Sequence, residues 1–190
     1  MSRDARPPSG PPPLTGPHTA FGHDDDDLIL SLLTYRSEDA HTWDALLARP
    51  RRHQEWPELC IVVHGAGGNY MSGVPRILAF ELARRGHPTL NINTRMANFG
   101  TAYGGGRLDL AHHDIKGALR CGRMLGFERF VLIGHREGMA AVVHFQAERA
   151  PTDVVAIVGA SPVPSLPDAT RARWGANGAE PDFGRVAREA

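Results

Sequence analysis

Short hydrophobic runs alternate along this chain with segments whose apolar residues recur at helical spacing. The run at residues 59–63, Leu-Cys-Ile-Val-Val, is uninterrupted, as in a strand buried on both faces. Runs of this kind predict strands over 28–35, 42–48, 59–63, 89–93, 130–133 and 154–158. Helical spacing predicts helices over 74–85, 108–125 and 139–150, the first two of which are followed by a glycine.

The order of these elements predicts the architecture. The first two strands are joined by a short turn over 37–40, which predicts an antiparallel hairpin. Strand and helix then alternate, and the short connections fit only crossover units. The fold class is therefore α/β, a mostly parallel sheet with helices on both faces and an antiparallel N-terminal hairpin. After Ser161 the pattern becomes loop-like, with a last helix expected over 183–189.

The first 26 residues differ in composition from the rest of the chain. They are rich in proline and glycine and lead through His23 into the acidic run Asp24–Asp27. Such a segment buries little, so we expect a disordered tail over 1–26 and one domain over 27–190. Carboxylates on a flexible run lack a fixed geometry, so we interpret this run as a solvated linker rather than a metal site.

Composition narrows the classes of function. The 190 residues are 42% hydrophobic, enough for one ordinary core. The 21 basic and 21 acidic residues balance, which argues against nucleic-acid and membrane-surface binding. The two cysteines form no CxxC pair, and no apolar segment follows the N-terminal arginines as a secretory signal requires. We therefore expect a cytoplasmic protein that has no metal site and no cofactor.

Two glycine-containing motifs follow predicted strands. His64-Gly65-Ala66-Gly67-Gly68 comes directly after the strand at 59–63. Gly134-His135-Arg136-Glu137-Gly138 comes after the strand at 130–133 and opens a helix. Ligands of open α/β sheets bind at the carboxyl ends of strands, so both motifs mark a candidate site. The two glycines of the second motif suit a sharp strand-to-helix turn.

The pair of motifs, in this order, resembles the α/β-hydrolase superfamily, in particular its esterase-like and lipase-like branches with an HGxGG loop. The resemblance covers residues 28–190 and implies a carboxylic-ester hydrolase. It also implies an oxyanion hole, the pair of N–H groups that binds the developing oxyanion. One N–H would come from Ala66 or its neighbours Gly65 and Gly67, and the other from Glu137.

The catalytic residues of that family are missing from their positions. The nucleophile position holds Arg136, and a guanidinium stays protonated and cannot attack a carbonyl. The family order is nucleophile, acid, histidine, but the one histidine after Arg136 is His144, inside the next predicted helix. The last strands of the family, which carry the acid and the histidine, also have no counterpart. The sequence thus predicts an incomplete, catalytically impaired relative.

Three other candidate groups carry less weight. Ser161 follows the last strand but has neither an elbow nor a base beside it. His112 and His113 are adjacent on a helix, where side chains point about 100° apart, so we expect that they do not chelate one ion together. The glycine-rich segment Tyr103–Arg107 lacks the phosphate-binding GxxxxGK[ST] pattern and is interpreted as an ordinary loop. The resemblance implies that the longer segment Met96–Arg107 borders the pocket.

Three functions remain open from the sequence: an ester hydrolase, a non-catalytic binding or interaction protein, or a fragment of a longer hydrolase. For the binding protein, Arg136 beside the N–H of Glu137 suggests a small anionic ligand such as a carboxylate or phosphate, and the family suggests an ester. The strand at 154–158 would be an exposed, strongly apolar edge, so a homo-oligomer through that edge is also expected.

Overall fold

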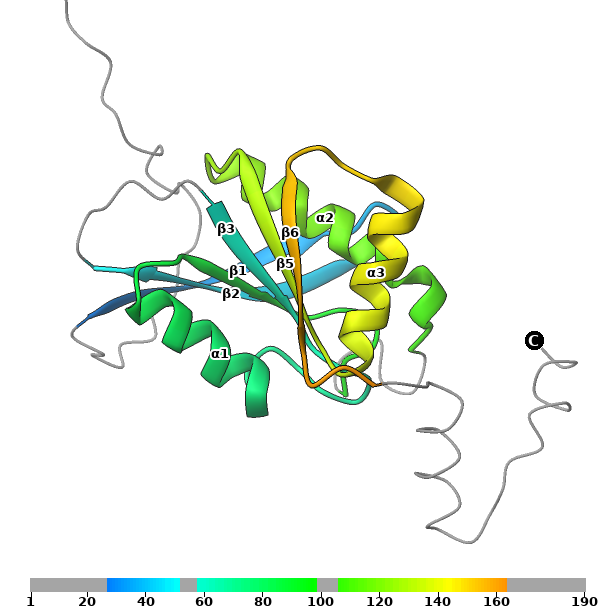
Figure 1. Cartoon of the computed structure of the whole chain (residues 1–190), viewed down its shortest axis with the longest axis horizontal. Helices are drawn as coiled ribbons and strands as arrows, with labels where there is room; N and C mark the ends of the chain where they lie inside the picture. Colours follow the sequence, from blue (N-terminus) through cyan, green and yellow to red (C-terminus); the bar gives the residue numbers. More distant parts are fainter. Residues whose placement is uncertain (1–26, 52–57, 99–105, 164–190) are drawn as a thin grey trace, which may run out of the picture.

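The computed structural model describes residues 27–51, 58–98 and 106–163, and these form one six-stranded sheet with helices against both faces (Figure 1). Along the chain the elements are β1 (Leu28–Arg36), β2 (Thr42–Pro50), β3 (Glu58–Val63), α1 (Gly73–Arg84), β4 (Thr89–Ile92), the 3₁₀ turn η2 (Leu108–Leu110), α2 (Ala111–Met124), β5 (Arg129–His135), α3 (Glu137–Arg149) and β6 (Val154–Ala160).

The strand order in the sheet is β1-β2-β4-β3-β5-β6. β1 pairs antiparallel with β2 and β2 antiparallel with β4, whereas β4, β3, β5 and β6 are parallel to one another. The predicted fold class is confirmed, including the N-terminal hairpin. Because the four parallel strands end at the same edge, the loops after β3 and β5 lie side by side there, as the registers Val63↔Gly134 and Val62↔Ile133 require.

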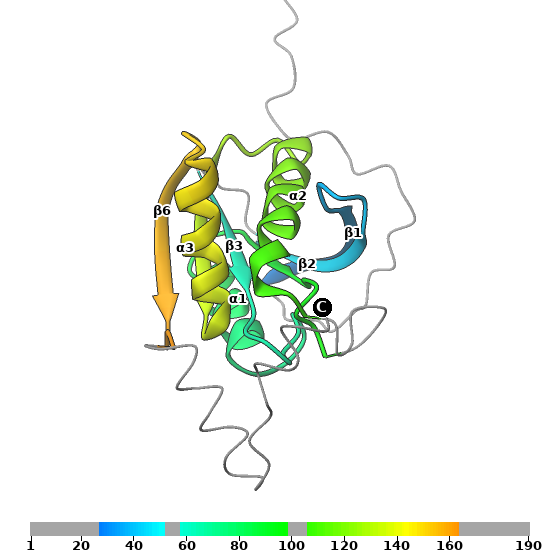
Figure 2. The ribbon, with the colours of Figure 1, turned by 90° about the vertical axis from the view of Figure 1, so that its right-hand side faces the viewer.

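The two faces of the sheet have separate cores. Leu59, Ile61 and Val63 of β3 pack with α2 and α3, whereas Cys60 and Val62 pack against α1. Figures 1 and 2 show α1 on one face and α2 with α3 side by side on the other. Successive side chains of a strand point to opposite faces of the sheet. Because both faces of β3 are covered by helices, the run at 59–63 is apolar at every position.

Several predicted elements differ from those observed in their bounds. The helix expected over 108–125 begins with the 3₁₀ turn η2 and becomes α-helical at Ala111. The tail over 1–26, the helix expected over 183–189 and all but the last two residues of the 103–107 loop lie outside the described residues. None of the helices in the described part of the chain is long and apolar enough to cross a membrane.

β6 is the most exposed strand of the sheet. Its only partner among the described strands is β5, and the side chains of Val155, Ile157 and Val158 are 43%, 39% and 46% exposed. The strand VVAIVGA carries no charge that would discourage pairing with another chain. An apolar outer edge, as expected from the sequence, is therefore present in the described fold.

A buried ion-pair network joins three elements on the α2 side. Asp114, which is fully buried, accepts hydrogen bonds from the indole N–H of Trp43 (2.8 Å) and from the backbone N–H and the guanidinium of Arg95 (2.9–3.0 Å). The same guanidinium donates to Asp39 in the β1–β2 turn at 2.9 Å. The network fixes the start of α2 and the loop after β4. The hydrophobic pattern of the sequence gives no indication of it.

Candidate functional site

The turn between β5 and α3 keeps the backbone of a nucleophile elbow. Arg136, at its apex, has φ 53° and ψ −122°, a conformation that costs a non-glycine residue about 1–3 kcal/mol. Both flanking glycines are required by close packing. A Cβ on Gly134 would lie 2.3 Å from the Cα of Met139, and a Cβ on Gly138 would lie 2.4 Å from the carbonyl oxygen of Val63. The turn therefore holds a strained backbone with an arginine at its apex.

The loop after β3 packs directly against this elbow. His64 is fully buried, and its Nδ1 lies 2.7 Å from the carbonyl oxygen of Gly65. Since a carbonyl only accepts, Nδ1 carries the proton, and Nε2 accepts the backbone N–H of Thr94 (3.2 Å). Burial lowers the pKa of His64, so the ring is neutral. Because the lone pair of Nε2 already accepts this hydrogen bond, His64 orders the loop and does not serve as a base.

Glu137 fills the position at which the resemblance places the oxyanion hole. Its carboxylate Oε2 accepts the backbone N–H of Ala66 at 3.2 Å, and the residue is only 8% exposed. The contact is so close that a Cβ on Gly65 would lie 2.6 Å from the same oxygen. Of the other loop N–H groups, that of Gly67 donates to the carbonyl oxygen of Met96 (2.9 Å). The candidate hole therefore already holds an anionic group of the protein itself.

The guanidinium of Arg136 lies at the mouth of this arrangement. The side chain is 52% exposed, and its Nε is 3.9 Å from Oε2 of Glu137. An ion pair at this distance and exposure is weak. The backbone N–H of Arg136 donates to the carbonyl oxygen of Ala160 at 3.2 Å, which ties the elbow to the end of β6. The apex of the elbow thus presents an exposed positive charge beside the buried carboxylate of Glu137.

A cavity of about 160 Å³ opens between the two motifs and the start of α1. Its lining comprises His64, Gly65, Ala66, Gly67, Gly68, Asn69, Ser72, Gly73, Val74, Pro75, His135 and Arg136. Asn69 and His135 belong to the two motifs that mark the candidate site in the sequence, although neither was assigned a role there. Ser72 was missed, because a single polar residue near a glycine motif carries no signal of its own. Burial and then the charge of Arg136 lower the pKa of His135, so this imidazole is neutral at pH 7.

The remaining candidates from the sequence lie elsewhere. His144 is eight residues along α3 from Arg136, about 12 Å at the helical rise, and its ring packs against His112 instead. Ser161 is exposed just beyond β6. The rings of His112 and His113 were expected to point apart, but their centroids lie only 4.0 Å from each other.

Comparison with known proteins agrees with this geometry. The sequence matches no protein-family model and no curated protein. Solved structures do match. The Pyrococcus furiosus esterase Pf2001 superposes with a TM-score of 0.64 at 18% identity, over 82% of this chain and 59% of that chain. Est1E from Butyrivibrio proteoclasticus, solved with ferulic acid, superposes with a TM-score of 0.62 at 20% identity, over 74% of this chain and 57% of that chain. This chain has the α/β-hydrolase fold.

A third solved structure, brefeldin A esterase, described as a bacterial homologue of human hormone-sensitive lipase, superposes with a TM-score of 0.60 at 20% identity. It is matched over 74% of this chain and 41% of its own length. The chain thus spans about two fifths to three fifths of the length of these three esterases. At these identities the likeness establishes the α/β-hydrolase fold, and the chemistry has to be argued from the residues in the elbow and loop.

Proposed function

We propose that this α/β-hydrolase-fold protein is related to the carboxylic-ester hydrolases but binds a small anionic ligand instead of cleaving an ester. The observation that carries the proposal is the contact between the Glu137 carboxylate and the N–H of Ala66, beside Arg136 at the nucleophile position. The proposal includes the cytoplasmic location that the composition favours.

Ester hydrolysis is disfavoured at two steps. Attack requires a nucleophile at the elbow, and the arginine there cannot act as one. The oxyanion that would follow requires N–H donors, but the Ala66 N–H already donates to Glu137, whose negative charge would repel a developing oxyanion. Each of the two motifs thus lacks a feature that acyl transfer requires, a nucleophile in one and an available N–H donor in the other. Both observations support a site that is not used for acyl transfer.

The internal carboxylate also indicates the class of ligand. The Ala66 N–H and the Arg136 guanidinium lie within 3.2 Å and 3.9 Å of Glu137 Oε2, so the site accepts a carboxylate of the protein itself. A soluble carboxylate or phosphate would bind by displacing the side chain of Glu137 into the adjoining cavity mouth and pairing with Arg136. Glu137 then acts as a competing internal ligand that sets the affinity.

The full chain is expected to show no hydrolysis of p-nitrophenyl acetate above the buffer rate, and Arg136→Ser alone is expected to restore none. A serine without an oriented base remains a weak nucleophile, and Glu137 still occupies the N–H of Ala66. Release of p-nitrophenol measures both rates. Burst kinetics in Arg136→Ser that disappear in Arg136→Ser/His135→Ala would contradict the proposal, because they would identify His135 as a competent base.

Binding is tested by titrating acetate and inorganic phosphate into the full chain while amide shifts of the 64–68 loop are followed by NMR. Glu137→Ala removes the internal competitor and is expected to tighten binding about tenfold or more, since a charge-assisted contact is released for the ligand. Glu148→Ala, on the exposed part of the same helix, is the matched control and should change nothing.

Arg136→Ala in the Glu137→Ala background should abolish the gain. If Glu137→Ala binds no more tightly than the unaltered chain, or if the double variant binds equally well, the anion-binding function is wrong.

A further inference from the structure

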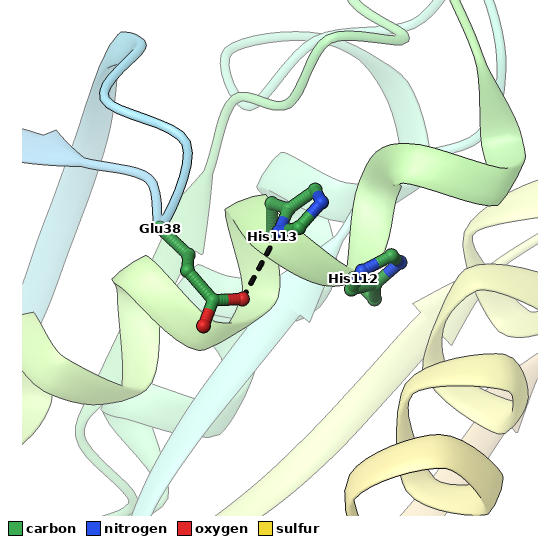
Figure 3. Close-up of side chains that lie close together, drawn as sticks. All are labelled: Glu38, His112 and His113. Atoms are coloured by element: carbon green, nitrogen blue, oxygen red, sulfur yellow. Dashed lines mark hydrogen bonds and ion pairs between the residues drawn. The ribbon is translucent and has the colours of Figure 1, made fainter.

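Glu38 brings three elements together on the side of the molecule that carries α2 and α3. Its carboxylate, in the β1–β2 turn, accepts a hydrogen bond from the ammonium of Lys116 and lies 2.9 Å from Nδ1 of His113 and 3.3 Å from the guanidinium of Arg149. Figure 3 shows the carboxylate facing His113, with His112 on the far side of that ring. Lys116 and Arg149 thus pair with the Glu38 carboxylate from two different helices.

Both histidines are oriented by an oxygen atom at Nδ1. Nδ1 of His112 lies 2.8 Å from the carbonyl oxygen of Asp109, and Nδ1 of His113 lies 2.9 Å from Glu38. Because a carbonyl and a carboxylate accept hydrogen bonds, both Nδ1 atoms are the donors in these contacts. An ion held by both His113 and Glu38 must replace the proton on Nδ1 of His113, since that nitrogen faces the carboxylate. Metal binding releases ligand protons of this kind.

The geometry brings the potential ligands close together. The ligand atoms of Glu38, His112 and His113 all lie within 4.8 Å of one another. Two ligands on one tetrahedral Zn²⁺ lie about 3.4 Å apart, so binding requires side-chain movements on the order of 1 Å, which partly exposed groups permit. His144 of α3 adds a third ring, with its centroid 5.6 Å from that of His112, near the roughly 5 Å expected of two imidazoles on one ion.

We propose that His112, His113 and Glu38, with His144 beside them, bind one divalent transition-metal ion of the zinc or nickel type. Imidazole nitrogens select such ions over Mg²⁺ and Ca²⁺, which prefer oxygen ligands. The site joins the β1–β2 turn to α2 and α3 and is independent of the elbow. Lys116 and Arg149 oppose the ion, because both hold the Glu38 carboxylate and both are positive.

The experiment is calorimetric titration of the full chain with ZnCl₂ and NiCl₂, with MgCl₂ as the comparison ion. We expect one equivalent of Zn²⁺ or Ni²⁺ to bind with micromolar affinity and Mg²⁺ not to bind. His112→Gln and His113→Gln should each weaken binding at least about tenfold, and Lys116→Met should tighten it about tenfold by removing a competing charge. The imidazole ¹⁵N shifts of the bound form should identify Nδ1 of His113 as a coordinating atom.

Two controls separate this site from other histidines. His87→Gln removes an exposed histidine between α1 and β4 and should leave the affinity unchanged. His23→Gln tests the run that precedes Asp24–Asp27. The proposal is overturned if no saturable binding occurs, or if binding is lost in His23→Gln and retained in His112→Gln/His113→Gln. Thermal unfolding without metal verifies that each variant is folded.

Discussion

Replacing Asp114 by alanine is expected to lower the free energy of unfolding by about 3–5 kcal/mol, because the change leaves the buried guanidinium of Arg95 without its principal partner. Asp114 is fully buried and Arg95 is 7% exposed, so water cannot take over the lost contacts. The indole N–H of Trp43 also loses its acceptor. Urea unfolding of the full chain, followed by circular dichroism, measures the difference.

Asp153→Ala provides the matched control. Asp153 also accepts two guanidinium hydrogen bonds, at 2.5 and 2.7 Å from Arg123, but that arginine side chain is 45% exposed. A surface pair of this kind contributes about 1 kcal/mol or less. If Asp114→Ala costs no more than Asp153→Ala, the network does not hold α2 and the loop after β4 in place as described.

Replacing Gly138 by alanine is expected to destabilise the protein by about 3 kcal/mol or more and to distort the elbow. The added Cβ would lie 2.4 Å from the carbonyl oxygen of Val63 and 2.5 Å from that of His64. Both are backbone atoms of β3 and the loop after it, so neither can move aside without shifting the sheet, and overpacking of this kind exceeds the usual 1–3 kcal/mol range. Thermal unfolding and the amide shifts of residues 64–68 provide the two measurements.

Gly159→Ala is the matched control for that substitution. Its new Cβ would approach only the side chain of Met139, at 3.4–3.7 Å, which is ordinary contact with a flexible group. We expect a change below about 1 kcal/mol. Equal losses in the two variants would show that the elbow does not depend on close backbone packing.

The sheet and its helices could be predicted because their signal is local. The apolar run at 59–63 and the helical spacing over 74–85 each report the face that the element buries. The elbow could be placed for the same reason, since Gly134 and Gly138 flank a strand end. Burial on opposite faces of β3 then follows from alternation alone.

The contacts made by charged side chains could not be predicted in this way. Glu137 was expected only to supply a backbone N–H, and its carboxylate in contact with Ala66 depends on how closely two loops approach in space. The convergence of Glu38 with His112 and His113 depends on a turn 75 residues from His113 in the sequence. Such contacts join elements distant in sequence, and spacing along one element carries no information about them.

The hydrogen bond from the N–H of Arg136 to the carbonyl oxygen of Ala160 has a mechanical consequence. It makes the last residue of β6 part of the scaffold of the elbow, while the other edge of β6 has no strand beside it in the described sheet. Adjacent strands lie about 4.8 Å apart, so a strand added to that edge would lie roughly 10 Å from β5. Tension or twist applied at that edge would reach the Arg136 peptide through a single intervening strand.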